Sequence, residues 1–319
     1  MPLLNPPDVL PEAMRYLLRA VMAHRGNRCV KDELIKLVAP SGLPELMKPL
    51  DTDREAERDA ESAAASGRLI AEKSLSALAA LGLVELDRKE VSVAEATSQR
   101  WSTVQDVSAL SFSQLLRSQI WSIAATTTAG SADARVWDLV NAVAVLFAAP
   151  EPLRPFDFEA GVGRRFDEAQ KRWFGQQKRQ WPVTNVEQYR SFCRWAPYLG
   201  FATPITGRSL VPDASRALLE DLADLPPGRM RAADFVARCG EQLPVSDGGL
   251  YTLWKPDDAQ ELSPGMSMSL RQLEAGGHVT LPTAESDTDT VLVTIGAPGD
   301  AARISHLDWH PQLPAKGRS

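Results

Sequence analysis

The chain has 319 residues, of which 44% are hydrophobic and 24% charged, a composition typical of a globular protein with two or three domains. Its longest strongly apolar stretch, AVAVLFAA at residues 142–149, is too short to cross a bilayer, and the N-terminus lacks a secretory signal, so we expect a cytoplasmic protein without membrane contact. The net charge of −6 argues against a dedicated nucleic-acid protein, because phosphate binding needs a cationic surplus, and limits any such contact to a local patch.

The first predicted module covers residues 1–100. Its first helix follows Pro11 and carries an apolar face at helical spacing, formed by Met14, Leu17, Leu18, Val21 and Met22. A short second helix at 31–39 and a third at about 67–81 follow, separated by an acidic helical insertion at 51–66. Gly82 then lets the chain reverse into two short strands at 83–86 and 91–93. Three helices followed by a hairpin is the order of a winged-helix domain.

The second predicted module covers residues 101–213. A strongly apolar helix at 132–149 is expected at its centre, and a later helix ends at Leu199-Gly200. Two strands at 201–205 and 210–211 then form a hairpin. The second module thereby repeats the helix, glycine and hairpin order of the first.

The third predicted module, residues 214–319, includes a C-terminal tail. Helices are expected at 214–225 and 231–240, and a further one ends at Gly276-Gly277. The apolar stretches 278–281 and 291–295 are expected to pair around an acidic turn. The sequence therefore predicts a mainly α protein with small β-hairpin wings (α+β), built from three tandem winged-helix domains.

A basic and aromatic segment at 164–181 lies inside the second module. Cations displace counterions from phosphate and aromatic rings stack on bases, so this composition is suited to nucleic-acid contact. The alternative is that the rings face the core while the cationic side chains cover its rim. The candidate nucleic-acid-binding cations of the segment are Arg164, Arg165, Lys171, Arg172, Lys178 and Arg179.

The helix that precedes each hairpin is the candidate for reading DNA, because such helices place polar side chains in the major groove. The second module offers Gln188, Arg190 and Arg194. The third is followed by an acidic turn that phosphate would repel. We therefore expect double-stranded DNA, if bound, to contact the second module, and the third module to pack against protein.

Two observations bear on catalysis. His306, Asp308 and His310 lie close together, and two histidines four residues apart on a helix can bind a metal, although a tail anchored by Trp309 is the simpler interpretation. No phosphate-binding loop, dinucleotide-binding glycine motif, nucleophile elbow or HExxH motif is present. We expect no catalytic residue, no metal and no cofactor.

The stretches LLNPPDVLPEAMRYLLRAVMAHRGNRCVKDELIKLVAP (3–40) and LSALAALGLVEL (75–86) resemble the DpdG family. That family belongs to bacterial clusters that place 7-deazaguanine derivatives in DNA and restrict unmodified DNA. The resemblance implies a phage-defence accessory protein that works with other proteins of a defence complex. Our hypothesis is a non-enzymatic component that binds DNA or acts as a scaffold; the alternatives are a winged-helix transcriptional regulator and a metal-dependent nucleic-acid enzyme.

Overall fold

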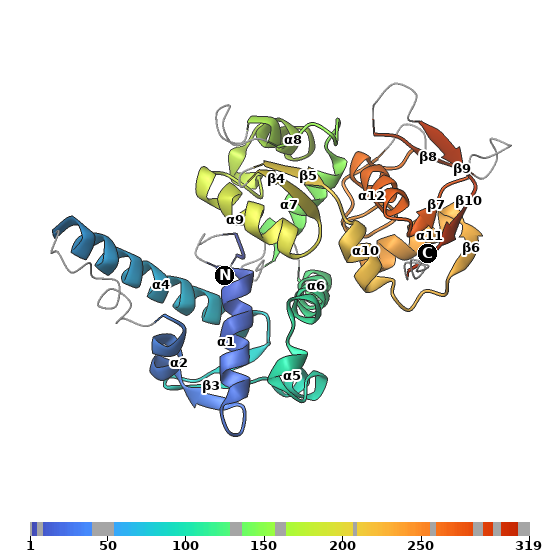
Figure 1. Cartoon of the computed structure of the whole chain (residues 1–319). Coiled ribbons are helices and arrows are strands. Elements are labelled where there is room, and N and C mark those ends of the chain that lie inside the picture. Colours follow the sequence, from blue (N-terminus) through green and yellow to red (C-terminus); the bar gives the residue numbers. More distant parts are fainter. Residues whose placement is uncertain are drawn as a thin grey trace, which may run out of the picture. The chain divides into compact units, whose positions relative to one another are not determined.

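The computed structural model describes residues 2–4, 9–39, 54–127, 136–156, 164–206, 209–255, 260–282, 290–295 and 301–311, with the backbone alone at 54–65, 164 and 206. These residues form two compact units, Met1–Val136 and Trp137–Ser319. Both combine helices with small antiparallel sheets, which confirms the expected class of fold (Figure 1). None of the helices in these ranges is long and apolar enough to span a membrane.

The first unit contains helices around a three-stranded sheet. In chain order its elements are α1 (Pro11–Ala23), β1 (Arg28–Val30), α2 (Lys31–Val38), α4 (Arg54–Ala80), β2 (Val84–Leu86), β3 (Glu90–Val93), α5 (Glu95–Arg100), the 3-10 turn η1 (Val104–Asp106) and α6 (Ala109–Thr126). Helices α1 and α2 and the β2–β3 hairpin were expected from the sequence, and α4 joins the expected insertion and third helix in one helix, whereas β1 and α5 were not expected. The sheet order is β1-β3-β2, with Cys29 opposite Val91 and Glu85 opposite Ser92.

The core of this unit lies between α1 and α4, which pack together along their apolar faces. Met14, Leu17 and Leu18 of α1 are fully buried against residues such as Leu75 and Leu78 of α4. Burying five such side chains contributes on the order of 10 kcal/mol of hydrophobic free energy before conformational entropy is subtracted.

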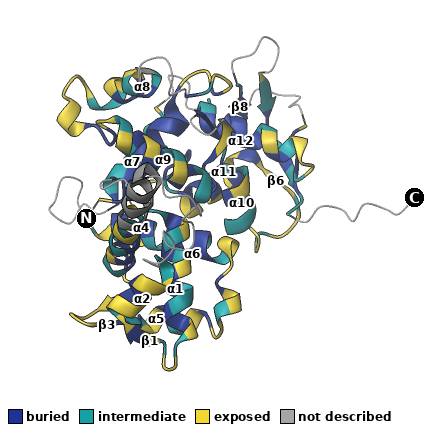
Figure 2. Cartoon of the chain, turned by 60° about the vertical axis from the view of Figure 1, so that its left-hand side comes forward, coloured by how far each residue is buried: buried dark blue, intermediate teal, exposed yellow. Residues whose placement is uncertain are grey.

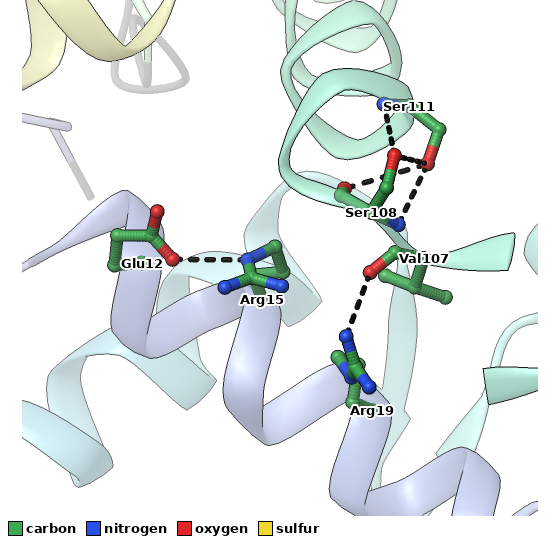
Figure 3. A network of polar contacts seen from close by, with 6 residues as sticks. All are labelled: Glu12, Arg15, Arg19, Val107, Ser108 and Ser111. Atoms are coloured by element: carbon green, nitrogen blue, oxygen red, sulfur yellow. Dashed lines mark hydrogen bonds and ion pairs between the residues drawn. The ribbon is translucent and has the colours of Figure 1, made fainter. Parts of the chain in front are cut away.

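Polar contacts join α1 to the start of α6 (Figure 3). Ser108 accepts a hydrogen bond from the Ser111 amide at 3.0 Å, and the Ser111 hydroxyl accepts one from the Ser108 amide, so each serine caps the other. Arg19 of α1 donates to the carbonyl oxygen of Val107 at 3.4 Å. The chain that enters α6 is therefore attached to α1.

The second unit is assembled from two successive sets of helices and strands. The first set is α7 (Trp137–Ala148), α8 (Arg164–Phe174), the 3-10 turn η2 (Lys178–Gln180), α9 (Val186–Tyr198), β4 (Ala202–Thr206) and β5 (Ser209–Pro212). The second set is α10 (Ser215–Asp221), β6 (Gly228–Arg231), α11 (Ala232–Gln242), α12 (Pro264–Ala275), β7 (Val279–Thr280), β8 (Val291–Val293), β9 (Ala302–Ile304) and β10 (His306–Trp309). Helix α7, apolar on all sides, is buried over residues 139–148 except at Asn141.

One predicted hairpin is wrong. The sequence analysis paired 278–281 with 291–295, but β7 pairs with β10 and β8 pairs with β9. Strand β10 also pairs with β6, so the sheet order is β6-β10-β7, and β8–β9 is a separate hairpin between β7 and β10. The acidic turn at 283–289 lies outside the described residues. Both β7 and β8 are short and apolar, and tertiary contacts decide which strand each one finds.

The same arrangement of elements occurs three times along the chain. In the first unit it is α1, β1, α2, α4, β2, β3, and in the last set it is α10, β6, α11, α12, β7, β10. In both, the first strand lies beside the last one. The set from α7 to β5 has a single bridge between Phe156 and Leu210 in place of the first strand, again beside the last strand, β5.

The hydrogen bonds at the helix-to-strand junctions also repeat. Gly82, Gly200 and Gly277 have φ angles of 71°, 81° and 76°. Each donates to the carbonyl three residues earlier, and the following amide, of Leu83, Phe201 or His278, donates to the carbonyl five residues earlier. This pair of bonds is the Schellman motif, which needs a left-handed residue at the glycine position. The glycine at each expected junction thus has the same local geometry.

Candidate nucleic-acid interface

Helix α8 carries the first half of the basic and aromatic segment and has one buried face. Phe166, Ala169 and Gln170 are buried, while Lys171 and Arg172 are exposed. The side chain of Gln170 donates to the Val183 carbonyl at 3.0 Å and accepts from the Val183 amide at 2.9 Å, which fastens the chain after η2 to α8. This double hydrogen bond fixes α8 and η2 relative to one another.

The side chain of Arg165 makes its contacts within the protein. Its guanidinium lies 4.4 Å from the centroid of the Phe156 ring and donates to the carbonyl oxygens of Pro150 and Glu151. Burial, followed by the charge of Arg154, lowers the pKa of Arg165. Its contacts indicate a role in holding the chain after α7, and the side chain of Arg164 lies outside the described residues.

The other four cations of the segment form what we call the basic cluster: Lys171, Arg172, Lys178 and Arg179. All are exposed, and none makes an ion pair with another described residue. Arg172 lies over Trp173 and Lys178 over Trp181, with 5.2 and 5.7 Å from cation to ring centroid. Such cation–ring contacts keep the charged groups at the surface.

Two of the four rings of the segment, Phe166 and Trp181, are buried. Phe166 is 1% exposed and Trp181 is 9% exposed, and Phe166 packs against Phe156, Tyr189 and Phe192. Trp181 donates from Nε1 to the Gly175 carbonyl at 2.9 Å. Base stacking by these two rings would require them to leave the core, so the burial favours the alternative interpretation, in which cations cover an aromatic core.

The N-terminus of α9 lies next to the basic cluster. Lys178 and Asn185 line one cavity of about 160 Å³ together with Asp167 and Tyr189. Burial raises the pKa of Asp167 although the nearby Lys178 lowers it. The Asn185 side chain caps α9 by accepting from the Gln188 amide at 2.9 Å. The cluster and α9 therefore belong to one surface region of the second unit.

The three predicted DNA-reading residues of α9 differ in their contacts. Gln188 uses its side-chain oxygen to accept from the amide and hydroxyl of Thr184, at 2.7 and 2.9 Å. Arg190 forms an ion pair with Glu187 at 2.5 Å. Arg194 is exposed on the same face. Only the last side chain points to solvent without a described ion pair.

Helices α4 and α12, which also end at a glycine junction, show the same pairing of arginine with glutamate. Arg68 of α4 is 2.9 Å from Glu72, and Arg271 of α12 is 2.9 Å from Glu274. These acidic partners were missed in the sequence analysis, although their spacing of three or four residues is visible in the sequence. Each pair places a carboxylate beside an arginine of a helix that was considered for reading DNA.

Helix α12 is buried over most of its length (Figure 2). It packs against α7, α10 and β5, and only Gln272 and Ala275 among its residues are exposed. A helix enters the major groove of DNA, which is about 12 Å wide, only if it protrudes from the protein surface. A helix enclosed like α12 does not protrude in this way. The set from α10 to β10 therefore uses this helix for packing within the chain.

The metal site that was weighed and set aside from the sequence would need His306 and His310 on one helix. His306 and Asp308 lie on strand β10 and His310 follows it, so the two histidines are not on a helix. Leu307 and Trp309, on the opposite face, are fully buried. Across the ranges that the structure describes, no group of three His, Cys, Asp or Glu residues is arranged to hold a metal ion.

Comparison with known proteins gives one match. A family model described as DpdG-like matches residues 1–288, which include the basic cluster and all three glycine junctions. No curated protein and no solved structure matches the chain significantly. The family resemblance stated from the sequence is therefore confirmed over most of the chain.

Proposed function

Because the chain belongs to the DpdG-like family, we propose that it is a non-enzymatic accessory component of a bacterial DNA-modification system of several proteins. We further propose that it contacts the phosphate backbone of duplex DNA through the basic cluster. The observation that carries this proposal is a contrast between two groups of cations: the four exposed cations on α8 and η2 make no ion pair with a described residue, whereas arginines of α4, α9 and α12 are paired with glutamate. Exposed cations release counterions from DNA, whereas a paired arginine must first give up its glutamate.

The repeated arrangement of elements supports the assignment of three winged-helix modules. A winged helix has three helices, a short strand after the first helix, and a two-stranded wing after the third. The order α1, β1, α2, α4, β2, β3 follows this pattern, as does α10, β6, α11, α12, β7, β10. Equivalent hydrogen bonds support the comparison: Lys31 donates to the carbonyl of Lys89, and Ala232 to that of Ser305, in each case before the last strand.

The cysteines support a role without nucleophilic catalysis. Burial raises the pKa of Cys193 to about 12 and that of Cys239 well above its ordinary value. Burial also raises the pKa of Cys29. At neutral pH all three are thiols, and the thiol is a far weaker nucleophile than the thiolate.

The DNA half of the proposal is tested by titrating a labelled 25-base-pair duplex at several salt concentrations. The four cations of the cluster are changed to Gln together. Each lost phosphate contact reduces the magnitude of the slope of log K against log salt by about 0.9. The magnitude of the slope should therefore be smaller in the variant by up to about 3.6. The matched control changes Arg25, Arg229, Arg231 and Arg238, also exposed, to Gln. Equal losses in both variants would assign binding to overall charge and reject the cluster.

A scaffolding role is the second candidate, and the three neutralised helices favour it. A helix face with a paired arginine and glutamate is less suited to phosphate than to a protein surface with complementary charge. Co-expression with the products of neighbouring genes, followed by size-exclusion chromatography of the purified mixture, tests this role. A complex that persists at a salt concentration that abolishes DNA binding would support scaffolding. If each of the other products elutes separately from the chain, the scaffolding role is rejected.

A further inference from the structure

A pocket of about 290 Å³ lies in the second unit, away from the basic cluster in the sequence. One wall is α11, and another is the chain at 260–262 that leads into α12. Asp247, Trp254 and Val291 of β8 complete the lining. The pocket is at the small end of the range for organic ligands, which suits a single flat group on a short chain.

The walls of this pocket are fixed by hydrogen bonds. Trp254 donates from Nε1 to the Glu261 carbonyl at 3.0 Å, which sets the orientation of the indole ring. Leu262 donates to the Leu292 carbonyl at 3.1 Å and Leu292 donates to the Gln260 carbonyl at 2.8 Å, so the chain before α12 is held against β8. A site with walls held in this way needs little ordering when a ligand binds.

Glycines bring the turn that carries Asp247 close to α11. A Cβ at Gly240 of α11 would lie 2.6 Å from the carbonyl carbon of Gly248, and one at Gly249 would lie 2.4 Å from the Pro244 carbonyl oxygen. Side chains at these positions would push the turn away from the helix. The close approach therefore fixes the backbone on both sides of Asp247.

Asp247 has an incomplete set of partners. The residue is 8% exposed, and its Oδ2 accepts from the Ser263 amide at 2.6 Å. Its Oδ1 is buried and has no hydrogen-bond partner among the described residues. The contact with Ser263 stabilises the start of α12 and accounts for one oxygen only. A buried carboxylate with an incomplete set of donors is costly, and a cation in the adjoining pocket lowers the cost of its charge.

We propose that this pocket binds an organic cation of the guanidinium class, which balances the charge of the Asp247 carboxylate and packs beside the indole of Trp254. A guanidinium is planar, presents several N–H donors in one plane and is more weakly hydrated than an ammonium, so it enters a partly apolar pocket at lower cost. Its flat face also stacks on an aromatic ring. The guanidinium reaches the site as a free small molecule or as an arginine side chain of a peptide, because both present the same group.

Isothermal titration calorimetry of the full chain tests the proposal with three probes. Agmatine represents the free small molecule, the blocked tripeptide acetyl-Ala-Arg-Ala-amide represents a side chain, and pentylamine represents an ammonium of similar length. Agmatine or the tripeptide should bind at least about tenfold more tightly than pentylamine, a difference of about 1.4 kcal/mol. Stronger binding of agmatine indicates a small-molecule site, and stronger binding of the tripeptide indicates a site for a partner's arginine.

Variants locate the binding. Asp247→Asn should weaken the better guanidinium probe at least tenfold, whereas Asp234→Asn, which changes an exposed carboxylate on α11, should leave its affinity unchanged. Ala233→Phe keeps Asp247 intact and fills the pocket from an exposed lining position, so it should also abolish binding if Asp247→Asn fails to fold. Absence of saturation by either guanidinium probe, equal binding of pentylamine, or unchanged binding in Ala233→Phe overturns the proposal. None of these results depends on DNA binding.

Discussion

Gly265 of α12 lies directly against Phe147 of α7. A Cβ at Gly265 would be 2.7 Å from the Phe147 Cα and 2.9 Å from its Cγ. This contact joins the two sets of elements in the second unit, because α12 packs on α7. We predict that Gly265→Ala destabilises the second unit by about 1–3 kcal/mol, since backbone atoms must move to make room. Urea unfolding followed by circular dichroism measures the loss.

Gly67→Ala is the control for this experiment. Gly67 lies inside α4, and among the described atoms its added Cβ would meet the Ala39 Cβ, at an ordinary contact distance of 3.7 Å. Alanine there should raise the free energy of unfolding by about 0.5–1 kcal/mol, because glycine is a poor helix former. Loss of stability in the control, or none in Gly265→Ala, would contradict the close α12–α7 contact.

The glycine junctions differ in the room around them. An added Cβ at Gly82 would have no neighbour within 4 Å, whereas one at Gly200 would lie 3.0 Å from the Ala217 amide nitrogen. Alanine at either position costs about 1–2 kcal/mol for the left-handed backbone. Gly200→Ala should cost more than Gly82→Ala because it adds a steric clash. Thermal unfolding of both variants checks the order, and the reverse order would refute it.

Asp247 should make stability depend on pH. Burial raises its pKa from 3.8 to about 6. The native chain then binds this proton more tightly than the unfolded chain, so the free energy of unfolding falls as pH rises from about 4 to about 6 and is constant above. The full effect of a shift of about two units is about 3 kcal/mol. In Asp247→Asn the free energy of unfolding should not fall in this way, so its value relative to the wild type should increase between pH 4.5 and pH 7.5 in urea unfolding. The same difference between variant and wild type at both pH values would exclude a raised pKa of Asp247.

The pairing of Arg190 should restrict DNA binding by α9. Glu187→Gln removes its partner, and we expect duplex affinity to rise about threefold at low salt, in line with the small free energy of an exposed ion pair. Glu241→Gln is the matched control, because it releases Arg238 from a similar pair on α11. Fluorescence anisotropy measures both. An equal rise in the two variants would trace the effect to net charge alone.

Local signals in the sequence predicted the helices and their glycine junctions. A left-handed glycine after an apolar helical stretch determines its own hydrogen bonds, so Gly82, Gly200 and Gly277 were recognisable without tertiary information. Strands β1 and β6 were missed because each has only three or four residues and is stabilised by a partner far along the chain. The β7–β8 pairing was wrong for the same reason.

The site was predictable in composition and only partly in geometry. The exposed cations of the basic cluster lie within the segment that was singled out, because charge and helical spacing are local properties. The hydrogen bonds from the Arg165 side chain to the Pro150 and Glu151 carbonyl oxygens were not predictable, because those oxygens belong to a preceding loop. The unpartnered Oδ1 of Asp247 was equally invisible, because it results from how α11, the following turn and α12 pack.

Strand β10 has a consequence for the order of folding. In the described part of the chain β6 and β7 are joined through β10, and His306 of β10 pairs with Arg231, 75 positions earlier. Closing so long a loop costs entropy before any contact repays it, and such non-local pairing slows folding. The β6–β10–β7 sheet should therefore acquire amide protection late, after the local helices, and until then the apolar surfaces of Phe235 and Trp309 remain open to misassociation.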